Sequence, residues 1–429
     1  MRVSSSACVI LCDTATICRH LTLSHSSMSK IAVVSFPGMN CEQETVRACT
    51  QSGMDAFVFR WNEERERLNS VDGYILPGGF SYEDRGRAGM AAAHDPLLEF
   101  LREESQQGKP IIGICNGAQI LVESGLIPLG HHLQFAIARN TTRQFINTWI
   151  WITPSCPPDR CTVSNWQGTM HIPIAHGEGR FTTRDRDLVQ ELQKNKQIAF
   201  SYCDEHGNTE KGNPNGSMLN IAGVCNPAGN IVALMPHPER SQNGDPFFQS
   251  LKTWMEKQKE ATAQNFSWEK QPQKLPNTPL SPHEKFCAVA VPEIFIQTCI
   301  TNNEEHTLEQ VGKRIVPSLK LKQLRYIACT HHNPYAFLEK ISHFNPHKER
   351  AYIRRNGRIT AWNMHKKQEE PIPTSPFVGI LFLRRDDEDA SDEGICYVCQ
   401  SEHPVQLDQR AFLEVLFNPH AHTLQKLLQ

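Results

Sequence analysis

The stretch PIIGICNGAQILVESG, residues 110–125, joins a short apolar run to a helical pattern through a single cysteine. IIGIC has the composition of a buried strand, and NGAQILVES has the spacing of an amphipathic helix. Cys115 therefore lies at a strand-to-helix turn, where a nucleophile elbow presents its side chain. Gly113 and Gly117 flank it, and glycine tolerates strained dihedrals and close backbone approach.

Two interpretations of Cys115 stay open on this stretch alone. A helix N-terminus carries partial positive charge, which favours the thiolate form of a cysteine placed there. That makes Cys115 a candidate nucleophile. The same pattern also fits a buried cysteine that acts as a small hydrophobe.

Apolar strands alternate with helical segments around this turn. Strands are predicted at 30–36, 56–61, 73–79 and 111–115, with helices at 41–53 and 95–108 between them. This alternation predicts an α/β fold with an open, mainly parallel, doubly wound sheet, whose active crevice lies beyond the carboxyl ends of the strands. After about residue 130 the pattern becomes more strand-like, with a hairpin turning at NPAG and a closing helix at 245–258.

Composition shifts divide the chain into four parts. We interpret residues 1–29 as an N-terminal extension, either disordered or the product of a wrong start site; the alternative is a weakly transit-like leader. Residues 30–256 form the α/β domain, and 257–282, rich in Gln, Lys and Pro, are predicted to be a linker. Residues 283–429 are predicted to be a small α+β domain of unknown fold and function, and we expect them to be dispensable for the site at Cys115.

Charge and cysteine content limit the class of protein. The 429 residues carry 44 Lys and Arg against 46 Asp and Glu, a net charge of -2, so neither nucleic acid nor a membrane is expected as a partner. No apolar run approaches the ~18 residues of a membrane span. The fifteen cysteines show no regular framework and are typical of reduced thiols in a cytoplasmic protein.

A cysteine nucleophile needs a base, and PHPER at 236–240 offers one. In an extended segment, residues two apart face the same way, so Glu239 could hold the imidazole of His237 toward Cys115. A His-Pro-Glu sequence also fits a plain surface turn. The oxyanion would need backbone donors, for which the glycine turn PGGF at 77–80 and the N–H of Asn116 are candidates.

These residues are similar to a known family. GICNGAQ together with PHPE resembles the class I (triad) glutamine amidotransferases. Further stretches narrow the resemblance to the free-standing glutaminase subunits of phosphoribosylformylglycinamidine synthase, over residues 30 to about 256. The stretches are FPGMNCEQET, LPGGFSYEDRGRAG, RNTTRQF, AHGEGRF, NPNGS, IAGVCNPAGN and PHPER.

The resemblance implies a role for each matching residue. Cys115 would be the nucleophile and His237 and Glu239 would complete the triad. Gly79 and Asn116 would form the oxyanion hole. The side chain of Gln119 and the loop around His176 and Gly177 would hold L-glutamine. The resemblance implies no metal site.

The resemblance also implies partners and a pathway. The glutaminase would pass ammonia to a large synthetase subunit in purine biosynthesis, with a small bridging subunit in the complex. No cofactor is expected in this chain; ATP and Mg²⁺ are expected on the synthetase, since no phosphate-cradling motif occurs here. The chain has Glu83 and Arg85 where the family usually has Gly and an aromatic residue, in a loop that lies near the glutamine site and the synthetase interface in that family.

Weaker signals leave alternatives open. CYVC at 396–399 is a C-x-x-C pair without a second pair at zinc-ribbon spacing. A fused bridging subunit in 283–429 is conceivable, but no motif supports it. A cysteine hydrolase on the same fold, or a glutaminase-like interaction subunit, are the alternative functions.

Overall fold

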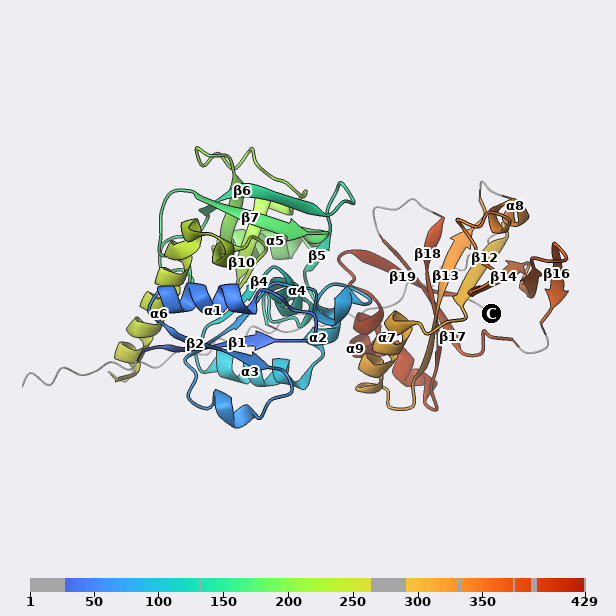
Figure 1. Cartoon of the computed structure of the whole chain (residues 1–429), viewed down its shortest axis with the longest axis horizontal. Coiled ribbons are helices and arrows are strands. Elements are labelled where there is room, and N and C mark those ends of the chain that lie inside the picture. Colours follow the sequence, from blue (N-terminus) through green and yellow to red (C-terminus); the bar gives the residue numbers. More distant parts are fainter. Residues whose placement is uncertain are drawn as a thin grey trace, which may run out of the picture.

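A computed structural model describes residues 28–130, 133–263, 291–330, 333–372, 375–386 and 392–427. It contains two units that lie side by side (Figure 1). The elements of the first unit are β1 (Lys30–Ser35), α1 (Glu42–Gln51), β2 (Asp55–Arg60), β3 (Gly73–Leu76), α2 (Met90–Ala93), α3 (Pro96–Gln106), β4 (Ile111–Ile114), α4 (Asn116–Glu123), β5 (Ala136–Arg139), β6 (Ile146–Pro154), β7 (Met170–His176), β8 (Glu178–Thr182), α5 (Arg186–Lys194), β9 (Ile198–Cys203), β10 (Ile221–Cys225), β11 (Ile231–Leu234) and α6 (Asp245–Ala263).

The first unit is built on one sheet of nine strands in the order β2-β1-β3-β4-β11-β10-β9-β6-β7. Strands β2, β1, β3, β4 and β11 run parallel, and β10, β9, β6 and β7 continue the sheet antiparallel. Helices α1 and α3 lie on opposite sides of the parallel part (Figure 1). The predicted parallel, doubly wound core is therefore confirmed.

Burial explains why these strands are apolar throughout. The side chains of Ile31, Ala32, Val33 and Val34 along β1 are fully buried, because helices cover both faces of the parallel strands. Strand β4 lies between β3 and β11, so its carboxyl end opens at the middle of the sheet. Cys115 follows directly after it. This places the elbow at the edge of the sheet where the fold class predicts the active crevice.

Two helices depart from the sequence-based expectation. The strand-like reading of residues 130–200 missed α5, which begins at the capping residue Asp185 and buries Leu188 and Leu192 one turn apart. Helix α6 continues to Ala263, so 257–263 are helical although their composition is typical of a linker. The rest of the predicted linker to residue 282 and the extension 1–27 lie outside the described residues.

The described residues of the second unit form an antiparallel sheet and three α-helices. Its elements are β12 (Glu293–Thr298), α7 (Asn303–Lys313), β13 (Lys320–Ala328), α8 (Pro334–Leu338), β14 (Glu349–Arg355), β15 (Arg358–Asn363), β16 (Gln368–Pro371), β17 (Ile380–Asp386), β18 (Glu393–Gln400), α9 (Arg410–Leu416) and β19 (His422–Leu427). The strand order is β16-β15-β14-β12-β13-β18-β17-β19. Cys396 and Cys399 of the C-x-x-C motif belong to two separate buried clusters of this unit, so they do not form a metal-binding pair with each other.

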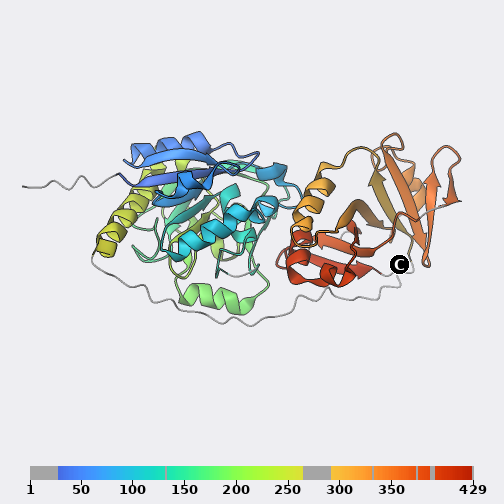
Figure 2. The ribbon, with the colours of Figure 1, turned by 90° about the horizontal axis from the view of Figure 1, so that it is seen from below.

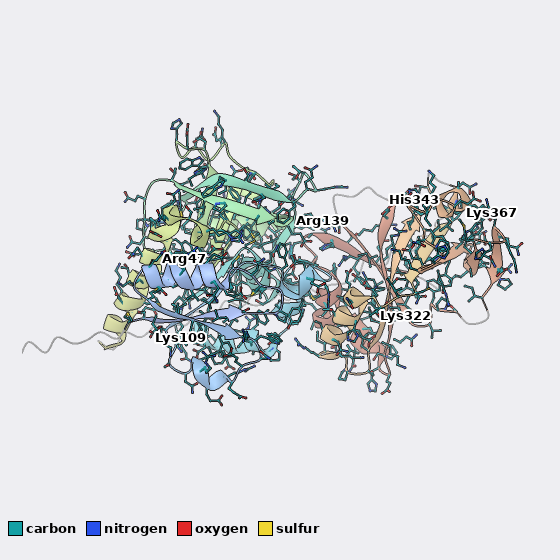
Figure 3. The ribbon with its side chains drawn as sticks, in the orientation of Figure 1. Arg47, Lys109, Arg139, Lys322, His343 and Lys367 are labelled. Carbon is teal, nitrogen blue, oxygen red and sulfur yellow. The ribbon has the colours of Figure 1, made fainter. Side chains whose placement is uncertain are left out.

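The two units meet where α7 and α9 face the region of α2 (Figure 2). Met90 and Ala91 of the first unit belong to the same buried apolar cluster as Leu308 and Phe412 of the second. Arg139 lies on the side of the first unit that faces the second (Figure 3), and its guanidinium is 3.3 Å from the Asp386 carboxylate.

Because the two units share this buried cluster, we no longer expect the second unit to be dispensable for the site at Cys115. Separating the units would expose apolar side chains of α2 to water.

No helix among the described residues combines the length and the apolar composition that a membrane crossing requires.

Candidate active site

Cys115 occupies a strained turn between β4 and α4. Its φ of 50° lies in the left-handed region, which is costly for a residue with a side chain and is held only by the surrounding structure. The Cys115 N–H donates to the Leu234 carbonyl oxygen of β11 at 2.8 Å, and the Gly117 N–H donates to the Pro77 carbonyl oxygen at 3.1 Å. The elbow predicted from the sequence is present.

The two flanking glycines are required by close backbone approach. A Cβ at Gly113 would lie 2.5 Å from the Gly117 carbonyl oxygen, and a Cβ at Gly117 would lie 1.9 Å from the Leu76 carbonyl oxygen. Neither separation is tolerable, because the partner atoms belong to the backbone of helix α4 and of the central strand β3. The G-x-C-x-G spacing thus follows from how tightly α4 packs over β3 and β4.

We predict that Gly117→Ala destabilises the protein by about 3 kcal/mol or more, since this clash can be relieved only by moving a core strand. Gly177→Ala is the matched control, because a Cβ there meets only the Phe145 ring, at 3.9 Å. Thermal unfolding of both variants checks this. Equal unfolding midpoints would contradict the close packing of α4 against β3.

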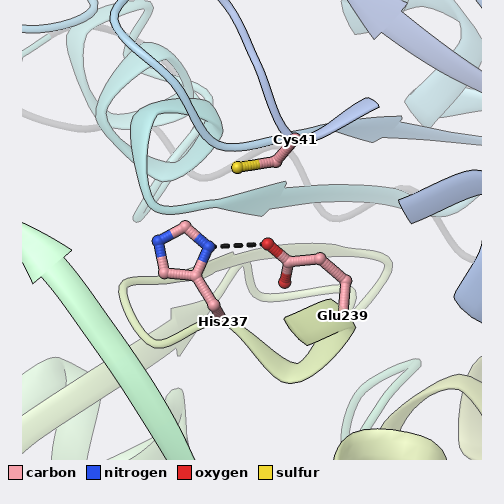
Figure 4. Close-up of side chains that lie close together, drawn as sticks. All are labelled: Cys41, His237 and Glu239. Atoms are coloured by element: carbon pink, nitrogen blue, oxygen red, sulfur yellow. Dashed lines mark hydrogen bonds and ion pairs between the residues drawn. The ribbon is translucent and has the colours of Figure 1, made fainter. Parts of the chain in front are cut away.

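His237 and Glu239 form a buried pair at the end of β11. His237 Nδ1 and Glu239 Oε1 are 2.6 Å apart (Figure 4), and both side chains are almost fully buried. The sequence argument placed both residues on an extended segment. Instead, Pro238–Arg240 form a 3-10 turn, which brings the Glu239 carboxylate back to the imidazole.

The surroundings keep the imidazole of His237 charged. Burial by itself would lower its pKa, but the Glu239 carboxylate and the sulfurs of Cys115 and Cys41 outweigh burial and hold the pKa of His237 well above 6.5. Nε2, the ring nitrogen away from Glu239, is buried and has no hydrogen-bonding partner among the described residues. The pair therefore offers an oriented, protonated imidazole beside the elbow cysteine.

Cys41 is a second thiol at this pair that sequence reasoning did not assign. It is fully buried, and Arg240 Nη2 donates to its sulfur at 3.0 Å. The sulfur lies next to the His237 ring (Figure 4). The signal was its position in PGMNCE at the carboxyl end of β1, the edge where the crevice lies.

Ligand atoms of Cys41, His237 and Glu239 lie within 4.8 Å of one another. Sulfur, imidazole and carboxylate together are a donor set that suits Zn²⁺. The Glu239 carboxylate also orients the His237 imidazole beside Cys115. A metal ion bound to these ligand atoms would therefore compete with the hydrogen bond between His237 and Glu239. The geometry favours that arrangement, since Nδ1 is already bonded to Glu239.

Two backbone N–H groups near the elbow are unused. The loop at Gly79 is held by the Phe80 N–H, which donates to the Gly38 carbonyl, and by the Asn40 N–H, which donates to the Gly78 carbonyl. Among the described residues, no acceptor is bonded to the N–H of Gly79 or of Asn116. Gly79 has φ of 146°, and a Cβ there would lie 2.4 Å from the Met39 Cα, so only glycine fits.

The Asn116 side chain ties the turn at 81–84 to helix α4. Its Oδ1 accepts from the Ser81 N–H at 2.9 Å, and its Nδ2 donates to Asp84 Oδ1 at 3.1 Å and to Gln119 Oε1 at 2.8 Å. Gln119 Nε2 in turn donates to the Glu178 carbonyl oxygen at 2.6 Å. Burial and the nearby Glu178 raise the pKa of Asp84 to about 7, against the opposing effect of the Asn116 bond. Asp84 was not assigned a role from the sequence.

His176 is the last residue of β7, and Gly177 follows it directly. His176 Nδ1 lies 3.1 Å from Asn140 Oδ1, and the Gly177 carbonyl accepts from the Asn140 N–H at 3.0 Å. Burial, reinforced by the charge of His237, lowers the pKa of His176 to about 4. His176 is thus neutral at pH 7 and places no second charge beside the protonated imidazole.

Comparison with known proteins agrees with this geometry. Residues 28–268 match the model of the CobB/CobQ-like glutamine amidotransferase domain. The phosphoribosylformylglycinamidine synthase subunit PurQ of Methanothrix thermoacetophila is 45% identical over 226 residues, covering 49% of this chain and 86% of that protein. The PurQ subunit of Pyrococcus horikoshii is 39% identical over 239 residues, covering 54% of this chain and 100% of that protein.

Among solved structures, PurLQS from Thermotoga maritima aligns at 30% identity with a TM-score of 0.45, over 53% of this chain and 100% of that one. The family match covers more than half of the chain and includes the elbow, the His237–Glu239 pair and the Gly79 loop. The chain belongs to the CobB/CobQ-like glutamine amidotransferase family.

Proposed function

We propose that this chain is the glutaminase component of a phosphoribosylformylglycinamidine synthase, which hydrolyses L-glutamine to glutamate and ammonia. The observation that carries the proposal is the buried His237–Glu239 pair beside the strained Cys115 turn. A pair of this kind, placed at an elbow, is the arrangement that activates a cysteine for attack on an amide. The likeness to PurQ subunits supports the substrate and the pathway.

The first half of the reaction is acyl transfer to Cys115. The thiolate attacks the side-chain amide carbon of glutamine, and the carbonyl oxygen becomes an oxyanion. The N–H groups of Gly79 and Asn116 stabilise that oxyanion. His237 then gives a proton from Nε2 to the nitrogen that leaves as ammonia, while Glu239 stabilises the charged ring from the other side. The product is a glutamyl thioester.

The second half releases glutamate. His237, now neutral, takes a proton from a water molecule, and the hydroxide attacks the thioester carbon. Collapse of the tetrahedral intermediate breaks the C–S bond, and the sulfur leaves as the thiolate. Gln119, His176 and Gly177 hold the amino-acid part of the substrate, and the neutral His176 accepts or donates a hydrogen bond without disturbing the charge of the triad.

The synthase reaction needs a partner. We propose a large synthetase subunit, which binds ATP and Mg²⁺ and receives the ammonia, and a small bridging subunit. Exposed aromatic side chains beside the site support docking there: Phe80, next to Gly79, and Phe145, next to Gly177, are 42% and 55% exposed, with ring centroids 6.5 Å apart. Aromatic residues of this kind are enriched at protein interfaces.

The test is glutamate release by the pure chain, with and without the synthetase, ATP and the nucleotide substrate. We expect slow release alone and a rise of at least about tenfold in the complete mixture, because closure of the partner interface orders the Gly79 loop. Rapid turnover by the chain alone, unchanged by the partner, would contradict the coupling. No turnover in either mixture would contradict the glutaminase assignment itself.

A further inference from the structure

The segment 81–90 lies between the glutamine site and the second unit. On its inner side, Ser81 and Asp84 are bonded to the Asn116 side chain, and the Ala88 N–H donates to Glu178 Oε2 at 3.2 Å. A Cβ at Gly89 would lie 2.6 Å from the backbone nitrogen of Ile120 in α4. The position of this segment therefore determines where the Asn116 and Gln119 side chains lie.

The same segment is strained. Tyr82, Glu83 and Asp84 have φ values of 51°, 58° and 53°, three consecutive left-handed conformations at residues other than glycine. Such residues keep that conformation only where their surroundings impose it. On the inner side, the bonds of Ser81 and Asp84 to Asn116 hold the two ends of this turn. Glu83 lies between these two ends, and its carboxylate is paired with Arg85.

Side chains and backbone of the second unit hold the outer side. Arg384 of β17 donates from Nη1 to the Gly86 carbonyl oxygen at 3.0 Å, and Arg85 Nη1 donates to Thr307 Oγ1 of α7 at 3.1 Å. A Cβ at Gly86 would lie 3.1 Å from Leu308, so α7 packs directly on this turn. Arg85 is thus at this contact, and Glu83 is linked to it through the Arg85 guanidinium.

A buried ion pair completes the contact. Arg87 Nη2 lies 2.6 Å from Glu123 Oε2, with both side chains less than a tenth exposed. The same guanidinium donates to the carbonyl oxygens of Glu414 and Val415 at the end of α9, at 2.7 and 3.0 Å. A buried guanidinium with these acceptors removed would be left with unmet hydrogen bonds, which is costly.

We propose that residues 291–427 act as a built-in positioning unit for the glutamine site. Thr307 and Arg384 are positioning residues that keep 81–90 in the strained conformation and, through it, hold Asn116 and Gln119 for catalysis. This inference rests on the proposed function and assigns a role to the second unit. Substrate contacts remain with the first unit.

Two adjacent arginines of β17 provide a matched test in the full-length chain. Arg384 and Arg385 each lie over a tyrosine ring of the second unit, Tyr397 and Tyr326, but only the Arg384 guanidinium is bonded to Gly86. Arg384→Ala is expected to lower the rate at which a chloroketone analogue of L-glutamine alkylates Cys115 by about three- to tenfold, the effect of losing its bond to the Gly86 carbonyl. Arg385→Ala is expected to leave that rate unchanged, and Arg384→Lys to restore part of it.

Hydrogen exchange gives a second readout that does not depend on activity. The backbone amides of 81–90 are expected to exchange faster in Arg384→Ala and in Thr307→Val than in Arg385→Ala, at equal thermal unfolding midpoints. Equal exchange and equal alkylation in the Arg384 and Arg385 variants would overturn the positioning role and leave the glutaminase proposal standing. Failure of the wild-type chain to react at Cys115 would overturn the glutaminase proposal and with it this inference, whatever the exchange rates.

Discussion

Replacing Cys115 by alanine is expected to lower glutamate release by the complete synthase mixture by about 10,000-fold or more. Loss of a nucleophile removes the covalent route, and what remains is the contribution of the oxyanion donors and substrate binding. The fold is expected to persist, because the backbone bonds of Cys115 and Gly117 hold the elbow, and the thiol adds only a long bond to the Ala175 carbonyl oxygen at 3.7 Å. Steady-state glutamate release and thermal unfolding measure the two effects.

Cys225→Ala is the matched control for this variant. Cys225 is also fully buried in the first unit, on β10, and has no role in the proposed chemistry. Its replacement is expected to cost stability, through a small cavity, and to preserve turnover. Activity of Cys115→Ala within about tenfold of the wild type would contradict the covalent mechanism.

Glu239→Gln is expected to lower kcat/KM for glutamine by about 100- to 10,000-fold. The amide keeps the size of the side chain, but it no longer carries the negative charge that stabilises the protonated ring of His237 and fixes its tautomer. Glu99→Gln is the control, since that carboxylate is exposed and pairs with Arg102 along α3, away from the site. Retention of full activity by Glu239→Gln would remove Glu239 from the triad.

The pH dependence of the same variant has a definite sign. Glu239 contributes to raising the pKa of His237, so the wild-type imidazole stays protonated to higher pH than a free histidine. Loss of the carboxylate lowers that pKa. The alkaline limb of the kcat/KM profile is therefore expected to move to lower pH in Glu239→Gln. An alkaline limb that stays in place or moves to higher pH would contradict the role assigned to this pair.

Local pattern was sufficient to predict the parallel half of the sheet and the elbow. Runs such as Ile31–Val34 are apolar because both faces of the sheet are covered, and the glycines around Cys115 follow from steric limits at single positions. Helix α5 was missed because its two buried residues, Leu188 and Leu192, form only a narrow stripe beside strand-like segments.

The contacts that complete the site could not be predicted from local pattern. Cys41 reaches the His237–Glu239 pair from a loop about 200 residues away in sequence, and the bond from Arg87 to the Val415 carbonyl spans 328 residues. No spacing rule encodes such contacts, since they depend on how whole elements pack. The 3-10 turn at Pro238 was missed for a related reason: two prolines favour extended neighbours, whereas the turn forms where this segment packs against α1, β7 and α6.

The central claim is that one thiol among fifteen is the nucleophile, and cysteine mapping tests it most directly. The full-length chain is treated with the chloroketone analogue of L-glutamine, with and without excess L-glutamine, and every cysteine-containing peptide is analysed by mass spectrometry. The account predicts a single adduct at Cys115 that L-glutamine prevents. An adduct at Cys41, the neighbouring buried thiol, or an adduct that L-glutamine does not prevent, would contradict it.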